Sequence, residues 1–265
     1  MLKLGSVPFL NASPLTYPLE KRMVDHNFDL YYFDPSILSK KLKNGDIDVG
    51  LIPVAELLMH DDYVVVPDIS ISSIGKVDSV ILQTKCDIKD LSTIAVDIRS
   101  QSSTALLKIV MELFLGLKPQ YIKREVDDDF IKEVDGGMLI GDSGLRALYN
   151  HKDEYNIYDL GELWTQNTGL PFVYAVFAMK EGVDLGKNYD SLIKSKEIGK
   201  KMIPQIIESR ADNLGISKDQ CFVYLNYRIK YDLGTKEIEG LYKYAELLHK
   251  INEIEKEYKI KIYNN

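Results

Sequence analysis

Two stretches of the chain decide the fold: VDSVILQT, residues 77–84, and FVYAVFAM, residues 172–179. Both have the length and the β-branched and aromatic content of buried strands. The residues between them, 86–174, show their own alternation of apolar runs and amphipathic segments, which is typical of an α/β unit. We therefore expect a two-lobed α/β protein in which these stretches cross between the lobes. Residues 1–85 and 175–265 form lobe 1, and residues 86–174 form lobe 2.

Helix boundary signals lie outward from these crossings. Ser13-Pro14 and Asp34-Pro35 each place an N-cap residue before a proline, whose fixed φ suits the first helical position. The second of these helices is predicted to end at Asn44-Gly45, because glycine readily adopts the left-handed conformation of a C-cap. A short helix is predicted over 54–59. Near the C-terminus, apolar residues at steps of three and four predict a long helix over 236–258.

The composition excludes several classes of protein. Hydrophobic residues make up 45% and charged residues 28% of the chain, a balance that disfavours disorder. The net charge of −7 disfavours sequence-independent binding of nucleic acid, which needs a cationic surface. The two cysteines, Cys86 and Cys221, are too few for a disulfide framework. No Cys-x-x-Cys motif or Cys/His cluster indicates a metal site.

The sequence also predicts where the protein works. No run approaches the roughly 20 apolar residues that span a bilayer. The first residues, MLKLGSVPFLNASPL, contain one lysine and lack the long apolar core of a signal peptide. We therefore expect a cytoplasmic protein without a membrane partner.

Asn11 lies where a predicted strand ends and a predicted helix begins. Ligands of α/β proteins bind outside the carboxyl ends of strands, and a helix N-terminus adds free N–H groups. Because the asparagine side chain both donates and accepts hydrogen bonds, Asn11 is a candidate for ligand binding. The alternative is that it only satisfies the backbone of the turn.

A second junction of the same kind lies in RSQSSTALLKIV, residues 99–110. Its hydroxyl groups crowd the N-terminus of an apolar helix and belong to Ser100, Ser102, Ser103 and Thr104. One hydroxyl suffices for capping. The others predict a site for a carboxylate or phosphate, with plain capping as the alternative.

Two further junctions carry candidate residues. Asp142 follows the predicted strand 138–140 and is a natural N-cap of the next helix. Its functional alternative is a role as base or as acceptor for a substrate hydroxyl. Thr168 and Gly169 precede the second crossing, where glycine either lets the backbone approach a ligand or only makes the turn.

These junctions occur in a fixed order from residue 6 to about residue 178. The stretches that carry the pattern are VPFLNASPL (7–15), NGDIDVGLIPVAELL (44–58), VPDISISSIGKVDSVIL (66–82), the turn Ser100–Thr104, LIGDSGLRA (139–147) and TGLPFVYAVFA (168–178). The span over which they occur covers two-thirds of the chain. The ordered set resembles the chorismate dehydratases of the futalosine route to menaquinone.

The resemblance implies a type II periplasmic-binding-protein-like fold with two interlobe crossings, used as an enzyme in the cytoplasm. The reaction would be the loss of water from chorismate, a dicarboxylate, to give 3-[(1-carboxyvinyl)oxy]benzoate. Aromatisation of the ring supplies much of the driving force, so a modest base and polar orientation suffice. No metal or organic cofactor is needed in this scheme.

The resemblance also assigns residues. The catalytic asparagine of the family matches Asn11, and a substrate-binding serine matches Ser79. The Ser/Thr turn matches Ser102–Thr104, although the family often has arginine where this chain has Ser102. For the base we expect the enolpyruvyl carboxylate of the substrate, with Asp142 as the protein alternative.

Two alternatives of function stay open at this point. The sister enzyme of the same pathway, which makes 1,4-dihydroxy-6-naphthoate, shares the fold but opens with a Cys-Pro-Asn-Asp motif and uses a histidine base. Here the opening is VPFLNASPL, and none of the four histidines lies at a junction. A non-catalytic solute-binding protein for a small anion is the other alternative, and it is expected to carry a signal sequence.

Overall fold

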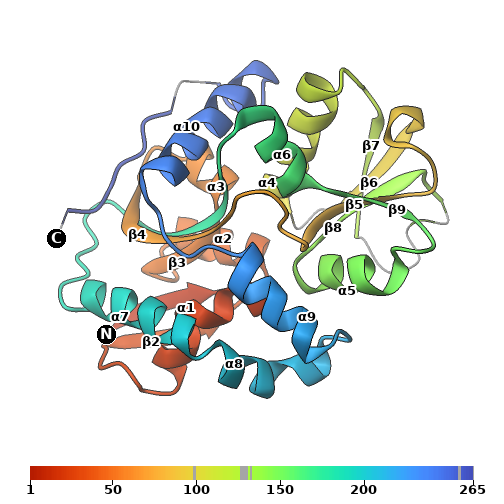
Figure 1. The fold of residues 1–265 in the computed structure, drawn as a ribbon. Helices are drawn as coiled ribbons and strands as arrows, with labels where there is room; N and C mark the ends of the chain where they lie inside the picture. The colour runs from red at the N-terminus through yellow and green to blue at the C-terminus, as the bar shows by residue number, and fades with distance from the viewer. Residues whose placement is uncertain (98–99, 126–130, 132, 256–257, 265) are drawn as a thin grey trace.

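The computed structural model of the chain describes residues 1–97, 100–125, 131, 133–255 and 258–264. They form two lobes, each built on a five-stranded mixed sheet (Figure 1). In each sheet, three parallel strands are followed by one antiparallel strand that arrives from the other lobe. A fifth strand completes the sheet beside it. The predicted two-lobed α/β fold is therefore confirmed.

The sheet of lobe 1 consists of β1 (Leu2–Ser6), β2 (Phe28–Tyr32), β3 (Val49–Pro53), β4 (Tyr63–Ser73) and β10 (Phe172–Lys180). Its strand order is β2-β1-β3-β10-β4. The strand β1 pairs in parallel with β2 and β3, whereas β10 is antiparallel to β3 and β4. Every residue of β3 except Pro53 is buried, as expected for an inner strand that is covered on both faces.

The sheet of lobe 2 consists of β5 (Val80–Thr84), β6 (Thr93–Asp97), β7 (Gln120–Arg124), β8 (Gly136–Ile140) and β9 (Asn156–Asp159). Its order, β7-β6-β8-β5-β9, repeats the plan of the first sheet. Here β6 is parallel to β7 and β8, and β5 is antiparallel to β8 and β9. The lobes are thus two variants of one architecture.

Helices cover both sheets and continue past them. The α-helices are α1 (Ser13–Glu20), α2 (Pro35–Asn44), α3 (Val54–Met59), α4 (Gln101–Lys108), α5 (Gly141–His151), α6 (Leu160–Thr168), α7 (Asn188–Lys201), α8 (Ile203–Arg210), α9 (Lys218–Val223) and α10 (Thr235–Lys250). Short 3₁₀ turns are η1 (Leu10–Ala12), η2 (Ile88–Asp90) and η5 (Ala211–Asn213), and π-helical turns are η3 (Ile109–Phe114) and η6 (Tyr224–Arg228). No helix in the described part of the chain is both long and apolar enough to cross a membrane.

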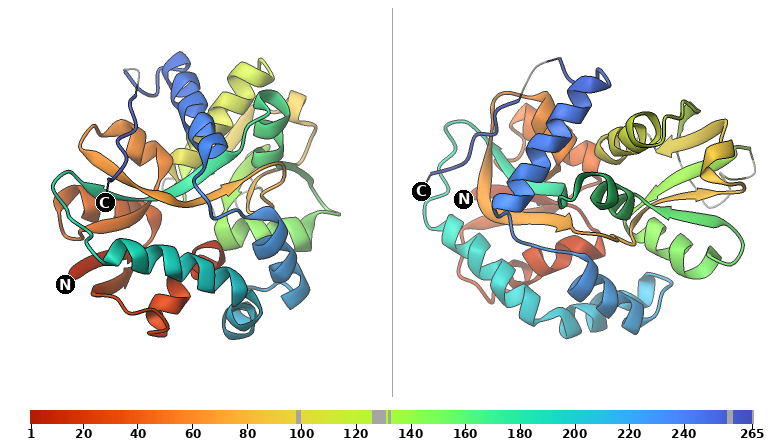
Figure 2. Two further views of the ribbon diagram at one scale, coloured as in Figure 1. Left: turned by 60° about the vertical axis from the view of Figure 1, so that its left-hand side comes forward. Right: turned by 45° about the horizontal axis from the view of Figure 1, so that its top comes forward.

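The C-terminal helices pack on lobe 1 and reach toward lobe 2 (Figure 2). The helix α7 lies along α1, and α10 packs on β10. The contact between α1 and α7 is close: a Cβ added to Gly199 would stand 1.7 Å from the carbonyl oxygen of Pro14. Farther along, α9 lies near α5 of lobe 2 (Figure 1).

The chain crosses between the lobes twice, at Ile74–Ser79 and at Gly169–Pro171. The prediction of a strand over 77–84 is wrong at its start, because the strand begins only at Val80. The backbone N–H groups of Val77 and Asp78 donate instead to the Asp159 carboxylate. These two residues therefore have no strand partner.

The pairing of strands shows to which sheet the residues near each predicted lobe boundary belong. The strand β5 belongs to the sheet of lobe 2, and β10 belongs to the sheet of lobe 1. Residues 80–84, which were predicted to belong to lobe 1, thus pair with strands of lobe 2. The exact limits of the lobes, 1–85 with 175–265 and 86–174, stay predictions.

Local signals placed several helices correctly. The helix α2 begins at Pro35 and ends before Gly45, which has the left-handed φ of 77° that the C-cap requires. The short helix α3 has the predicted bounds. The predicted helix over 236–258 ends early, at Lys250, because Asn252 turns the chain with a φ of 58°. Residues 256–257 lie outside the described part of the chain.

Candidate functional site

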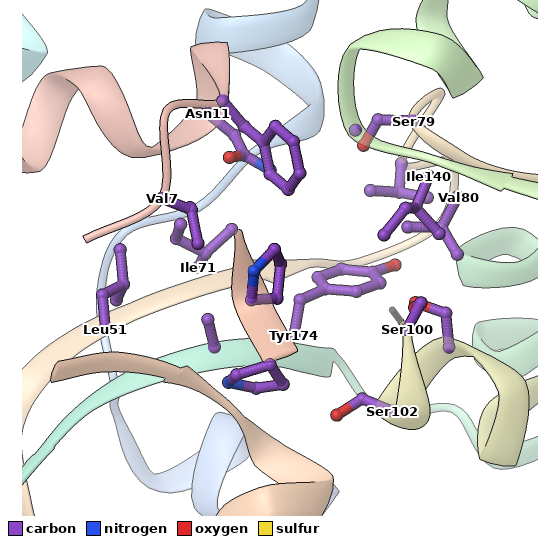
Figure 3. A pocket seen from close by; sticks show the side chains of 17 residues that line it. Val7, Asn11, Leu51, Ile71, Ser79, Val80, Ser100, Ser102, Ile140 and Tyr174 are labelled. Atoms are coloured by element: carbon purple, nitrogen blue, oxygen red, sulfur yellow. The ribbon is translucent and has the colours of Figure 1, made fainter. Parts of the chain in front are cut away.

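Each lobe brings a strand-to-helix junction to one shared cavity. In lobe 1, β2 and β3 flank β1 on opposite sides, so the carboxyl end of β1 is a topological switch point. In lobe 2, β7 and β8 flank β6 in the same way. Such points are where open α/β sheets bind ligands. Asn11 follows β1, the serine turn (Ser100, Ser102 and Ser103) follows β6, and both line one interlobe cavity (Figure 3).

Apolar groups form most of the cavity wall, and none of the described residues that line it is charged. The apolar lining consists of Val7, Phe9, Pro35, Leu51, Pro53, Ile71, Val77, Val80, Ile140 and Ala175, with Gly141 beside them. The polar lining consists of Asn11, Ser79, Ser100, Ser102, Ser103 and Tyr174. The N-terminal ends of α2, α4 and α5 also reach the cavity, and each brings the positive end of its helix dipole there.

Asn11 has the one buried side-chain oxygen of the described cavity wall that lacks a hydrogen-bond partner. This Oδ1 atom does not satisfy the backbone of its own turn. Buried polar atoms are almost always paired in native proteins, so an unpaired one needs an explanation. A hydroxyl or N–H group of a ligand in the cavity would supply the missing donor.

Ser79 faces the same cavity from the first crossing. Its side chain is 1% exposed, and its Oγ accepts a hydrogen bond of 2.8 Å from the hydroxyl of Tyr224. The preceding residue, Asp78, holds a left-handed φ of 63°. A Cβ added to Gly144 would lie 2.5 Å from the Ser79 carbonyl oxygen, so this glycine allows α5 to approach the crossing.

The residues of the serine turn have different contacts: one joins the two lobes, and others line the cavity. Ser102 Oγ accepts a hydrogen bond of 2.8 Å from the backbone N–H of Ala55 at the start of α3, which ties lobe 2 to lobe 1. Ser103 lines the cavity. Thr104 is not part of the described lining, and its hydroxyl donates to the carbonyl of Ser100 at 2.7 Å. Ile98 and Arg99, which precede the turn, lie outside the described residues.

Asp142 also ties the lobes together. Its Oδ1 accepts a hydrogen bond of 3.2 Å from the backbone N–H of Leu10, and it is not the N-cap of α5, which is Ile140. Burial raises the pKa of Asp142, while the bond from Leu10 and the charges of Arg146 and Arg210 oppose this increase. Asp142 is not part of the described cavity lining. Its role as a catalytic group stays a prediction.

Thr168 and Gly169 end α6 outside the cavity. Gly169 is the C-cap residue with a φ of 70°, and the Thr168 hydroxyl donates to the Trp164 carbonyl at 2.8 Å. Neither residue belongs to the described lining. Their role in substrate binding stays a prediction, and their observed contacts are those of a helix terminus.

Two tyrosines near the site were not anticipated. Tyr174 lines the cavity from β10, and its hydroxyl shares a hydrogen bond of 3.0 Å with Ser73. Burial raises its pKa well above the usual value, so it stays neutral. The sequence held a signal for Tyr174, since it is the polar group within FVYAVFAM. Nothing local marks Tyr224, because its partner Ser79 is 145 residues away.

Comparison with known proteins places the chain in a family. A family model described as menaquinone biosynthesis matches residues 2–250. The chain belongs to the menaquinone biosynthesis family. The resemblance seen in the junction motifs is thereby confirmed.

Relatives with known names span nearly the whole chain. A chorismate dehydratase of Thermus thermophilus is 29% identical, covering 92% of this chain and 94% of the relative. A chorismate dehydratase of Campylobacter jejuni is 27% identical, covering 94% and 98%. The alkanesulfonate-binding protein SsuA of Xanthomonas axonopodis, solved with bound MOPS, superposes with a TM-score of 0.72 at 14% identity, over 100% of this chain and 98% of that one. This last likeness confirms a periplasmic-binding-protein-like fold.

Proposed function

We propose that this protein is a chorismate dehydratase, which removes water from chorismate to give 3-[(1-carboxyvinyl)oxy]benzoate. Family membership and the names of two full-length relatives support the proposal. The enzyme class would be a hydro-lyase, and the location would be the cytoplasm, where a biosynthetic enzyme of this kind meets its substrate. The proposal concerns the interlobe cavity.

The cavity suits a compact ring that carries two carboxylates. Its apolar walls, such as Ile71 and Val80, would pack on the ring. The helix N-termini of α4 and α5 would hold the carboxylates through backbone N–H groups, which bind anions without a full positive charge. Ser103 would add a hydroxyl donor at the start of α4. This arrangement supplies a source of positive potential other than the arginine that the family often has at the position of Ser102.

The reaction breaks two bonds on neighbouring ring carbons. A base takes the proton from the carbon that bears the ether oxygen, and the electron pair of that C–H bond forms the new ring double bond. The adjacent C–O bond breaks, and the hydroxyl group leaves and gains a proton to become water. Asn11 and Ser79 are in place to orient the leaving hydroxyl, because a hydrogen bond to the developing oxygen anion lowers the barrier.

We assign the base to the enolpyruvyl carboxylate of the substrate. The described lining of the cavity holds no aspartate, glutamate or histidine. The protein alternative, Asp142, uses Oδ1 to accept the N–H of Leu10. A carboxylate that arrives with the substrate is held close to the ring hydrogen, which makes its proton transfer effectively intramolecular.

The main support for the proposal is the buried, unpaired Oδ1 of Asn11 on the wall of a cavity whose described lining holds no charged residue. Chorismate has one hydroxyl group, and it is the group that leaves. Incubation with chorismate, followed by ultraviolet spectra and mass analysis, tests the reaction. We expect a benzoate-type product lighter by one water. Chorismate that binds and is recovered unchanged would instead identify a solute-binding protein.

A further inference from the structure

Tyr224 begins the π-helical turn η6 in the C-terminal third, outside the part of the chain that lines the cavity. The residue is fully buried, with 1% of its surface exposed. Single π-helical turns often occur at functional sites, because the wider turn displaces side chains from their ordinary helical positions. The turn η6 makes two polar contacts with the crossing.

These two contacts hold two consecutive residues of the first crossing. The hydroxyl of Tyr224 donates to Ser79 Oγ at 2.8 Å, and Nε of Arg228 donates to Asp78 Oδ2 at 2.8 Å. The hydroxyl of Tyr149 donates to the same Asp78 oxygen at 3.1 Å. Asp78 itself has the left-handed φ of 63°, a conformation that costs free energy in a residue with a side chain. The surrounding contacts therefore determine where Ser79 points.

The direction of the Tyr224 bond matters for chemistry. A serine hydroxyl has one proton to donate and can accept hydrogen bonds at its oxygen. Since Ser79 Oγ accepts the proton of Tyr224, the proton of Ser79 is left to donate elsewhere. Figure 3 shows Ser79 across the cavity from Asn11. A ligand oxygen between the two side chains would receive this proton.

The side chain of Tyr224 also interacts with Asn11. Burial raises the pKa of the Tyr224 hydroxyl, whereas the side chains of Ser79 and Asn11 both act to lower it. The phenol therefore stays protonated and remains a donor at any working pH. The Tyr224 hydroxyl thus bonds to Ser79 and interacts electrostatically with Asn11.

We propose that Tyr224 is a positioning residue of the reaction, which holds the Ser79 hydroxyl as a donor aimed into the cavity. The inference rests on the proposed function and deepens it. Tyr224 would not touch the substrate, because it is not part of the described lining. It would act by selecting one rotamer and one proton direction of Ser79, so that the donor is in place before the carbon–oxygen bond breaks.

The test removes one hydroxyl from Tyr224. In Tyr224→Phe the ring and its packing stay, and Ser79 loses the donor that orients it. We expect kcat/KM for chorismate to fall roughly tenfold, the scale of one well-placed hydrogen bond, with most of the loss in kcat. The double variant Ser79→Ala with Tyr224→Phe should be no slower than Ser79→Ala alone, since the two residues act as one unit.

Tyr231→Phe is the matched control. Tyr231 is also buried, at 3% exposed, and its hydroxyl has no hydrogen-bond partner. Its removal should leave kcat/KM unchanged. Wild-type kinetics in Tyr224→Phe, or a tenfold loss that persists in the Ser79→Ala background, would overturn the inference. If the wild-type protein binds but does not convert chorismate, the proposed function fails first, and the inference falls with it.

Discussion

At the first crossing the chain is held by charges and hydrogen bonds, whereas at the second it is held by aromatic rings. In Ile74–Ser79, the Asp159 carboxylate accepts three N–H bonds from Val77 and Asp78, and Arg228 pairs with Asp78. The polar contacts fix a strained backbone. They also fix the direction of Ser79, which lines the cavity.

Around Gly169–Pro171, the ring of Phe172 lies between Trp164 and Tyr244, with centroid distances of 5.1 and 5.0 Å. The indole Nε1 of Trp164 donates to the Pro171 carbonyl at 3.2 Å. These three rings come from α6, β10 and α10, so the cluster joins both lobes to the last helix. Such a cluster buries a large apolar area, and its polar atoms, Trp164 Nε1 and the Tyr244 hydroxyl, donate to the backbone carbonyls of Pro171 and Ser102.

The difference indicates a division of labour between the two connections. Packing of the aromatic cluster is expected to hold the lobes together, because burial of large rings contributes most of the favourable free energy. The polar crossing is expected to orient groups for chemistry at some cost in stability, because burial of a carboxylate is unfavourable. Each of the following changes should affect stability or activity, and not both equally.

The largest effect is expected at the aromatic crossing. Trp164→Ala should lower the free energy of unfolding by about 3–5 kcal/mol, the range for a fully buried large side chain. Urea unfolding measures this loss, and kcat per folded molecule should stay near the wild-type value. Phe222→Ala, which removes a ring that is 40% exposed, is the control and should change little. An equal loss of stability in both variants would show that the aromatic cluster makes no special contribution.

The opposite pattern is expected at Asn11. Asn11→Ala should reduce kcat at least about 10²-fold, as for a deleted oxyanion-type donor, and should leave the stability almost unchanged. Product affinity should change much less, because an interaction made only in the transition state is absent from ground-state binding. Asn11→Asp should additionally weaken binding through charge repulsion with a dianionic substrate. If Asn11→Ala turns over chorismate at nearly the wild-type rate, Asn11 has no catalytic role and only forms the turn.

The polar crossing should make stability depend on pH. Burial raises the pKa of Asp159 from 3.8 to about 6, so the folded state holds this proton more tightly than the unfolded state. Stability should therefore decrease as pH rises from 4 to 7, by about 2 kcal/mol from this group. Asp142, whose pKa is raised in the same direction, adds to the slope. The comparison of wild type with Asp159→Asn isolates one carboxyl, and an unchanged slope in that variant would contradict the assignment.

The smallest expected effects distinguish the roles of two neighbouring serines, Ser102 and Ser103. Ser103→Ala should weaken chorismate binding by about 1–2 kcal/mol, the scale of a hydrogen bond to a charged group, with the stability unchanged. Ser102→Ala should instead leave the buried N–H of Ala55 unpaired and lower the free energy of unfolding by about 1–2 kcal/mol. Calorimetric titration measures the chorismate affinity of each variant, and urea unfolding measures its stability. If Ser103→Ala lowers only stability, the turn is a plain cap.

Local rules predicted the parts of the fold that depend on neighbours in the chain. The helices α2 and α3 follow from capping, proline and glycine signals, which act within a few residues. The positions of Asn11 and of Ser102 and Ser103 on the cavity follow from the rule that ligands bind beyond the carboxyl ends of strands. That rule needs only the order of strands and helices.

Long-range partners explain what the local rules missed. The start of β5 was misplaced because the N–H groups of Val77 and Asp78 bond to Asp159, about 80 residues farther along the chain. Asp142 was expected to cap its own helix, and it bonds instead to Leu10 of the other lobe. In both examples a carboxylate meets a backbone N–H that only the fold brings near.

By itself, the sequence determined the α/β class, the two crossings and the positions of the strand-to-helix junctions, because periodicity and capping are encoded within each segment. Only the tertiary structure decided which of those side chains point into the cavity and which tie the lobes together. It also brought Tyr224 to Ser79 and three aromatic rings to the second crossing. The physical reason is that a hydrogen bond or ring contact depends on separation in space, and folding, not chain order, sets that separation.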